Sequence, residues 1–141
     1  MPEIRWRHDR SRLIVRAAVL PPAGAPNETM LIAVNALLDT GATRSGLTAR
    51  IAEALDLPGL GKKPVQTAGG MIQTERYAFR IGFYPSPEIT AYPHILDGTF
   101  YGIGLADSES FQIIAGMDVI GRNHLELHGD GTSIFRFGSP H

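Results

Sequence analysis

The amino-acid sequence predicts a mostly β fold with one or two short helices, on three observations. Sixteen Gly and ten Pro divide the 141 residues into short pieces, which is typical of β-rich domains with many turns. Most pieces between these turns carry alternating or continuous apolar residues over the length of a strand. Only one stretch has a clear helical period. Because no fixed-period repeat or linker interrupts the pattern, we expect a single domain over residues 1–141.

The first half of the chain is expected to contain two strands and one helix. Residues 12–20 (RLIVRAAVL) are the first strand candidate, closed by a Pro- and Gly-rich turn. Residues 29–39 (TMLIAVNALLD) are the second, with the nearly continuous apolar run of a strand covered on both faces. A helix is predicted over residues 48–59, with Thr48 as its N-cap and Pro58-Gly59 at its end. Its expected apolar face consists of Ile51, Ala52, Ala54 and Leu55.

Two hairpins are predicted in the middle of the chain. Residues 63–84 form the longer one, with Ala68-Gly69-Gly70 at a flexible tip. Apolar residues alternate on one face of its return strand, at Tyr77, Phe79, Ile81 and Phe83. Residues 92–105 are predicted to form a second hairpin that turns at Asp97-Gly98.

Two further elements close the chain. Residues 111–121 (FQIIAGMDVIG) lead from a strand into a short helix. Residues 125–137 are predicted to form the closing hairpin, with Gly129-Asp130-Gly131 at its turn.

Composition restricts the possible partners and locations. The net charge of -1 gives no reason to expect a nucleic-acid or membrane partner held by charge, and the basic stretch at residues 4–16 is interpreted as a solvated strand edge. The lack of Cys excludes disulfides, thiolate metal sites and a cysteine nucleophile. No apolar run approaches the roughly 20 residues of a membrane span, and the first residues lack a signal-peptide core. A cytoplasmic location is therefore expected.

One aspartate stands where a carboxylate is costly. Asp39 ends an apolar run, and burying it is unfavourable unless it is hydrogen-bonded or has a function. Gly41 allows a close approach of the backbone and leaves an amide that can hydrogen-bond the carboxylate. The Thr40 hydroxyl can bond a backbone group of a facing loop. This pattern indicates a functional aspartate at the end of a strand.

The stretch Leu37-Leu38-Asp39-Thr40-Gly41-Ala42 resembles the motif of the retropepsin-like aspartic proteases, the single-lobe relatives of pepsin. The family also has an apolar pair and a Gly before a short helix, and IIAGMDVI provides this 75 residues after Asp39. A Gly-containing hairpin lies between the two, where the family has a flap over its substrate. The resemblance covers residues 31–127. It implies the acid-protease fold, a folded and closed β-sheet with one or two short helices.

The resemblance implies catalysis by two carboxylates that hold a water between them. One accepts a proton from the water as it attacks the peptide carbonyl, and the other, protonated, donates to the carbonyl oxygen. Because two like charges at short range do not both ionise, the pair shares one proton. The chain carries only one such motif. The second carboxylate is therefore expected from another copy of the chain, across a two-fold axis between the two Asp39 side chains.

Further roles follow from the same resemblance. Thr40 and Gly41 would fix the catalytic loop, with Thr40 bonding the backbone of the symmetry mate. Residues 12–20 and 133–137 are the candidates for terminal strands that interleave in the homodimer. The substrate-binding residues it implies are Ala42, Ala68, Gly69 and Gly70.

The chain departs from the family pattern in two places. Ala115 precedes Gly116, where a larger aliphatic residue is usual, and this predicts looser packing behind the catalytic loop. Residues 84–107 are longer and richer in Pro and Gly than in the minimal viral fold. Residues 95–99 (ILDGT) look like the motif with two letters exchanged, but Gly98 would put the wrong groups around the carboxylate, and a hairpin turn explains them better.

Other chemistry has weaker support. Asp118 is expected to begin a short helix in a structural role, and it could also bond Thr43 or Ser45 behind the catalytic loop. The five His residues lack metal-ligand spacing, so no zinc site is predicted. No Gly-x-Ser-x-Gly pattern supports a serine hydrolase, and TAGGMI lacks the Lys of a phosphate-binding loop.

The leading hypothesis is thus an aspartic endopeptidase that acts as a homodimer on peptide or protein substrates. No metal or organic cofactor is implied. One alternative is a catalytically silent domain of the same fold that serves as a dimerisation or peptide-binding module, because fold does not guarantee function. Another is a processing protease with one narrow substrate.

Overall fold

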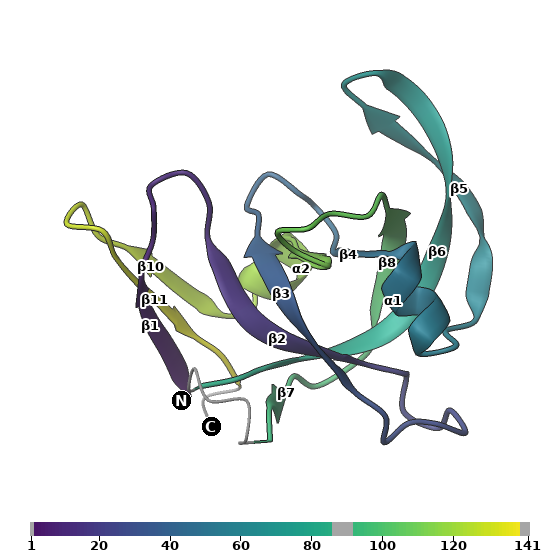
Figure 1. Ribbon diagram of the computed structural model, residues 1–141, viewed down its shortest axis with the longest axis horizontal. Coiled ribbons are helices and arrows are strands. Elements are labelled where there is room, and N and C mark those ends of the chain that lie inside the picture. Colours follow the sequence, from purple (N-terminus) through teal and green to yellow (C-terminus); the bar gives the residue numbers. More distant parts are fainter. Residues whose placement is uncertain (1, 86–91, 139–141) are drawn as a thin grey trace.

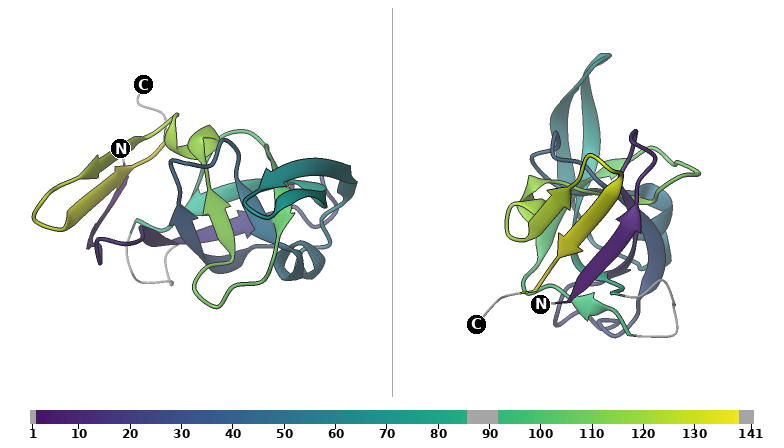
Figure 2. Two further views of the ribbon diagram at one scale, coloured as in Figure 1. Left: turned by 90° about the horizontal axis from the view of Figure 1, so that it is seen from above. Right: turned by 90° about the vertical axis from the view of Figure 1, so that its left-hand side faces the viewer.

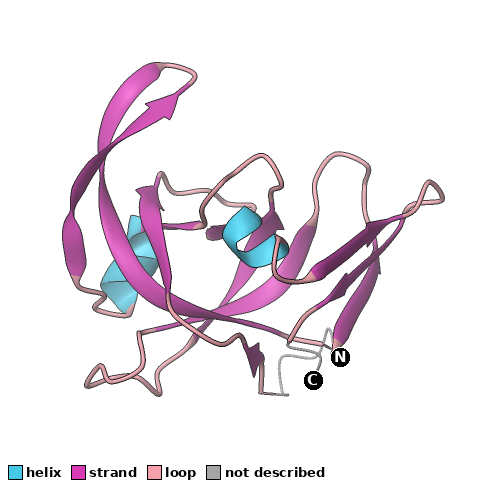
Figure 3. Ribbon diagram, turned by 180° about the vertical axis from the view of Figure 1, so that it is seen from behind, coloured by secondary structure: helices cyan, strands magenta, loops and turns pink. Residues whose placement is uncertain are grey.

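A computed structural model describes residues 2–85 and 92–138 of the chain. Strands dominate it and two short helices complete it, as the sequence predicts (Figure 1). The strands form an eight-stranded sheet and a separate three-stranded sheet. Figure 3 shows one helix beside the larger sheet and the other near the middle of the molecule, between the larger sheet and the three-stranded sheet. No helix in the described part of the chain is long and apolar enough to cross a membrane.

The larger sheet closes on itself. Its strands are β2 (Ile14–Leu20), β3 (Ile32–Leu38), β4 (Gly46–Thr48), β5 (Gly59–Thr67), β6 (Gly70–Phe83), β7 (His94–Ile95), β8 (Phe100–Leu105) and β9 (Ile113–Ala115). They follow the order β2-β3-β9-β4-β8-β6-β5, with β7 also on β6, and a β2–β6 pairing closes the ring. The closed ring leaves the β5–β6 hairpin projecting from one side (Figure 1).

The apolar alternation of β6 supplies much of the core. Phe79, Ile81 and Phe83 are fully buried and Tyr77 is half-buried, so the predicted inward face is confirmed. Burying each of these large side chains contributes roughly 1.5–3 kcal/mol to folding. Phe83 also contacts Phe135 edge-to-face at a centroid distance of 5.0 Å, which joins the ring to the smaller sheet.

The predicted helix is present but shorter than expected. Helix α1 spans Ala49–Ala54 with Thr48 at its N-cap, and it ends before Pro58-Gly59. Asp56 adopts a positive φ of 49°, and the Leu57 amide bonds back to the Ala52 carbonyl, so the chain leaves the helix one turn early. Ala54 is consequently exposed rather than part of the buried face.

The hairpin predicted over residues 92–105 is wrong. A bend at Asp97-Gly98 is present, with Gly98 at a φ of 91°, but the strands on either side of it do not pair with each other. Both β7 and β8 pair with β6 instead, because β6 is a 14-residue strand long enough to take them in succession along one edge. Residues 86–91 of the long 84–107 segment lie outside the described residues.

The smaller sheet has a strand that the sequence did not predict. Its members are β1 (Glu3–Arg7), β10 (His124–Leu127) and β11 (Thr132–Arg136), in the order β1-β11-β10. The β10–β11 hairpin is the predicted closing hairpin. Figure 2 shows this sheet standing at one end of the molecule, beside the ring. Strand β1 lies at the edge of the sheet, which agrees with the interpretation of the first part of the basic stretch, residues 4–16, as a strand edge.

The strands expected to interleave in a dimer are differently placed. Strand β11 lies between β1 and β10, so both of its edges are occupied within the chain. Strand β2 pairs with β3 and, over Ala17–Leu20, also with β6. Pairing within one chain thus occupies both edges of β11 and, over Ala17–Leu20, both edges of β2. The interleaving of residues 12–20 and 133–137 between two chains stays a prediction. The free edges of the smaller sheet belong to β1 and β10.

Candidate active site

Asp39 lies directly after β3, at the start of the loop that leads to β4. Its amide donates to the Ala115 carbonyl at 2.9 Å, which extends the parallel β3–β9 pairing by one residue. The side chain is half-buried, while Thr40 and Gly41 are exposed. This loop, residues 39–45, is called the catalytic loop below, after the role that the sequence motif predicts for it. Strand β3 thus leads to the surface, and Asp39 follows directly after the last residue of its pairing with β9 (Figure 1).

The carboxylate is oriented by its own loop. The Gly41 amide donates to Asp39 Oδ1 at 2.9 Å, as the sequence motif predicts. A Cβ at position 41 would lie 3.2 Å from that oxygen, so glycine permits this close approach. Among the described residues, none hydrogen-bonds the exposed hydroxyl of Thr40. The loop therefore presents one carboxylate and one free hydroxyl side by side.

A buried serine holds the catalytic loop from behind. Ser45 is fully buried, and its hydroxyl donates to Asp118 Oδ1 at 2.7 Å. The Ser45 hydroxyl oxygen accepts the Gly116 amide at 3.1 Å, and the Ser45 amide donates to Asp118 Oδ2 at 3.0 Å. Asp118 lies in the first turn of helix α2 (Met117–Ile120) and has the structural contact with Ser45 that the sequence suggested. The end of the loop is thereby fixed to the helix.

The start of α2 packs closely on the same loop. The Met117 amide donates to the Ala42 carbonyl at 2.7 Å. A Cβ on Gly116 would lie 2.7 Å from that carbonyl oxygen, so glycine is required by the close packing of two backbones. Ala115, where the sequence predicted looser packing, is fully buried.

The predicted flap is the β5–β6 hairpin. Its tip turns at Ala68-Gly69, and the Thr67 hydroxyl donates to the Gly70 carbonyl at 2.7 Å across the turn. Gly70 has a φ of 113°, which favours glycine. Met71 and Ile72 beside the tip are 60% and 50% exposed. Such apolar groups on a projecting hairpin suit contact with a substrate or a second chain.

The structure places the expected site residues in two separate groups. Asp39, Thr40, Gly41 and Ala42 lie together on the catalytic loop, whereas Ala68, Gly69 and Gly70 lie on the flap tip. Within the described chain, no hydrogen bond connects the tip with the catalytic loop. Figure 3 shows the hairpin rising beside the ring and curving over the side on which the loop lies.

A cavity of about 390 Å³ opens next to Asp39, and the sequence did not predict its far wall. Leu37 to Thr40 form one side, and the loop from His8 to Leu13 forms the other. The Leu38 amide donates to the Leu13 carbonyl at 2.8 Å, which ties this loop to the end of β3. The only sequence signal was the basic composition of residues 4–16, which does not indicate where the loop folds.

Asp9 fixes the shape of that loop. Its Oδ1 accepts the amides of Ser11 and Arg12 at 2.8 and 2.9 Å, and also the Ser11 hydroxyl. These hydrogen bonds, led by the Arg12 and Ser11 amides, lower the pKa of Asp9 from 3.8 to about 2. The loop beside Asp39 is therefore held by an ionised carboxylate down to acidic pH.

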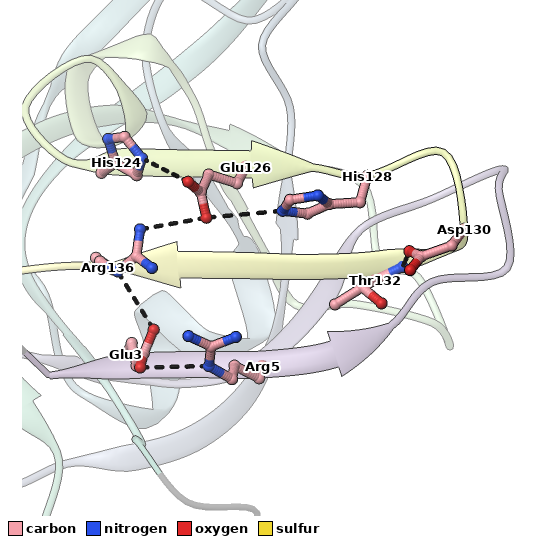
Figure 4. Close-up of polar contacts among 8 residues, drawn as sticks. All are labelled: Glu3, Arg5, His124, Glu126, His128, Asp130, Thr132 and Arg136. Atoms are coloured by element: carbon pink, nitrogen blue, oxygen red, sulfur yellow. Dashed lines mark hydrogen bonds and ion pairs between the residues drawn. The ribbon is translucent and has the colours of Figure 1, made fainter.

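No cluster of three His, Asp or Glu side chains in residues 2–85 and 92–138 is arranged to hold a metal ion. The histidines of β10 and its turn instead take part in ion pairs on the outer face of the smaller sheet (Figure 4). His124, His128 and Arg136 all contact Glu126, at 3.4, 3.8 and 3.2 Å. The contact with the His124 imidazole, together with the charge of Arg136, holds the pKa of Glu126 below its ordinary value.

Comparison with known proteins agrees with this geometry. A solved structure titled as a retropepsin-like aspartic protease from Rickettsia conorii superposes with a TM-score of 0.60, over 96% of this chain and 90% of that one, at 18% sequence identity. The chain has a retropepsin-like fold. A sequence model of the family described as aspartyl protease matches residues 24–82, which include the catalytic loop and the flap. A search of curated protein sequences found no match.

The two comparisons agree with each other: the matching sequence model is that of aspartyl proteases, and the structural likeness is to a retropepsin-like fold. The matched region, residues 24–82, includes Asp39 and its neighbours, whereas Asp97 lies outside it. The present chain has each structural element that accompanies the motif: strand β3 before Asp39, Gly116 packed behind the loop, and the short helix α2.

Proposed function

We propose that this retropepsin-like chain is an aspartic endopeptidase that acts as a homodimer on peptide or protein substrates. The observation that carries the proposal is the presentation of Asp39. One carboxylate oxygen accepts the Gly41 amide, and the side chain borders an open cavity of about 390 Å³ at the end of β3. The buried Ser45 and the half-buried Asp118 hold the loop that carries it.

The chemistry requires a second carboxylate, and a two-fold axis beside the catalytic loop would supply Asp39 of the partner chain. The two groups would share one proton and hold a water between them. The ionised group takes a proton from the water as the water oxygen bonds to the peptide carbonyl carbon. The protonated group donates to the carbonyl oxygen. The group that took the proton from the water then passes it to the amide nitrogen, and the tetrahedral species collapses to a carboxylic acid and an amine.

The exposed position of Thr40 supports this arrangement. Its hydroxyl is free to hydrogen-bond the partner's backbone and so fix the two loops at one separation. The free edges of β1 and β10 offer backbone groups for strand pairing between the two chains. An extended peptide would lie between the flap and the catalytic loop, with alternate side chains in pockets on either side. Ala42, Ala68, Gly69 and Gly70 would line that path, and a cytoplasmic location is part of the same proposal.

The test is cleavage of a peptide library from acidic to neutral pH by the wild type and by Asp39→Asn at equal dimer concentration, checked by sedimentation. Cleavage by the wild type that is lost in the variant is expected. Cleavage that survives in the variant would remove Asp39 from the mechanism. A stable dimer that binds peptides without turnover would favour the silent peptide-binding module over the protease.

A further inference from the structure

A second cavity lies between the catalytic loop and the base of the flap, and its walls are basic. It has a volume of about 400 Å³. Arg44, the next to last residue of the catalytic loop, forms one wall. Lys63 of β5 and Arg76 of β6 form the wall on the flap side, and Tyr101 to Ile103 of β8 form the floor. Because it joins these two elements, the cavity lies on the path proposed for the substrate.

Strand geometry explains why the cations gather there. Lys63 pairs with Thr74 across the flap, and Arg76 follows Thr74 by two residues, so all three side chains lie on one face of the hairpin. Arg76 in turn pairs with Ile103 of the floor. The Arg76 guanidinium donates to the Leu60 carbonyl at 3.3 Å, which holds it at the cavity without neutralising its charge.

No carboxylate balances these charges within the described residues. The ion pairs among those residues all lie on the smaller sheet and involve neither Arg44, Lys63 nor Arg76. The acidic residues of this region lie on the other face of the flap base. There Glu53, Asp56 and Glu75 line a separate cavity of about 330 Å³. The two faces of one hairpin thus have opposite charge, although the whole chain has a net charge of only -1.

Arg44, Lys63 and Arg76 are exposed and solvated, and together they make the cavity more favourable for an anionic group than for a cationic one. A carboxylate there would form charge-assisted hydrogen bonds with a guanidinium and an ammonium, whereas a lysine would meet repulsion. We propose that this cavity selects acidic side chains of the substrate, so that the enzyme prefers peptides with Glu or Asp near the scissile bond. Arg44 and Lys63 are the specificity-determining residues. The inference rests on the proposed function of Asp39.

Two-fold symmetry gives the selection a distinctive form. A homodimer has two copies of the cavity, one on each side of the paired Asp39 residues. The acidic preference is therefore expected at two substrate positions, one before and one after the scissile bond. The far wall of the Asp39 cavity also carries Arg10 and Arg12, whose two positive charges exceed the single negative charge of Asp9 in the same loop.

The experiment compares kcat/KM for peptides that differ only by Glu, Gln or Lys at each position around a cleaved bond. The wild type is expected to prefer Glu over Lys by about tenfold at the two sensitive positions at low salt, and less at high salt. Lys63→Gln and Arg44→Gln should each reduce this ratio several-fold. Lys62→Gln is the matched control, because Lys62 pairs with Glu75 on the opposite face, and it should keep the wild-type ratio.

Cleavage with equal rates for the Glu and Lys peptides would overturn the inference while leaving the protease intact. An equal loss of selectivity in the Lys62 and Lys63 variants would also overturn it, because the cause would then be net charge. If no peptide is cleaved, the proposed function fails and binding of the same peptides decides the inference. Tighter binding of the Glu peptide that is lost in Lys63→Gln would support the basic cavity, and equal binding would contradict it.

Discussion

Replacing Ser45 by alanine should destabilise the protein more than any other loss of a single hydroxyl in its core. Ser45 is fully buried and makes two side-chain hydrogen bonds, to Asp118 at 2.7 Å and from Gly116 at 3.1 Å. A hydrogen bond to a charged group contributes about 1.5–3 kcal/mol, and a buried amide left without a partner costs about 1–3 kcal/mol. The Asp118 carboxylate keeps its bond from the Ser45 amide. We therefore expect Ser45→Ala to lower the free energy of unfolding by about 3 kcal/mol.

Ser133 provides a control of the same residue type and burial. It is also fully buried, but among the described residues no group hydrogen-bonds its hydroxyl. Ser133→Ala should change the free energy of unfolding by less than about 1 kcal/mol, since it removes a polar group without a partner. Urea unfolding of both variants and the wild type at one protein concentration measures the difference. Equal destabilisation by the two substitutions would refute the account of Ser45 as the support of the catalytic loop.

Three other substitutions test separate parts of the structure. Gly116→Ala should lower the free energy of unfolding by about 2 kcal/mol or more, because the new Cβ would meet a backbone carbonyl of the catalytic loop at 2.7 Å. Gly129→Ala is the control: position 129 has open space around it, so this substitution should leave the urea midpoint nearly unchanged. Asp9→Asn should lower stability at neutral pH, and its deficit should vanish in acid. The folded-state pKa of Asp9, about 2, lies below the ordinary 3.8, so the contribution of Asp9 to stability is nearly complete above about pH 4 and is lost as the pH falls through 2. A deficit in acid as large as the deficit at neutral pH would contradict this. Asp39→Asn should keep the wild-type unfolding midpoint, because an amide oxygen can still accept the Gly41 hydrogen bond, and a large loss would mean that the aspartate has mainly a structural role.

Much of the fold and the central site residue could be predicted from local sequence. The apolar run before Asp39, the glycine after it and the alternation of Phe79, Ile81 and Phe83 each follow from short-range periodicity and the needs of a hydrogen-bonded carboxylate. The contact between Asp118 and Ser45 was also within reach, because both polar residues lie next to motif elements that pack together.

The remaining features depend on pairings that local patterns do not determine. The bend at Asp97-Gly98 looks like a hairpin turn, yet β7 and β8 pair with the long strand β6, and only the length of that strand explains it. Strand β1 and the loop that borders the Asp39 cavity follow from pairing with β11, more than 120 residues away in the chain. The basic cavity likewise depends on Arg44, Lys63 and Arg76 meeting in space from three separate elements.

The central claim is that one active site needs Asp39 from two chains, and mixing wild type with Asp39→Asn tests it most directly. Equal amounts of the two would be unfolded together, refolded at random and assayed on a cleaved peptide against the wild type at the same total concentration. If both carboxylates are needed, only the wild-type homodimers are active, and about a quarter of the activity should remain. Retention of about half would mean that each chain works alone, and about three quarters that one Asp39 per dimer suffices; either would contradict the shared site.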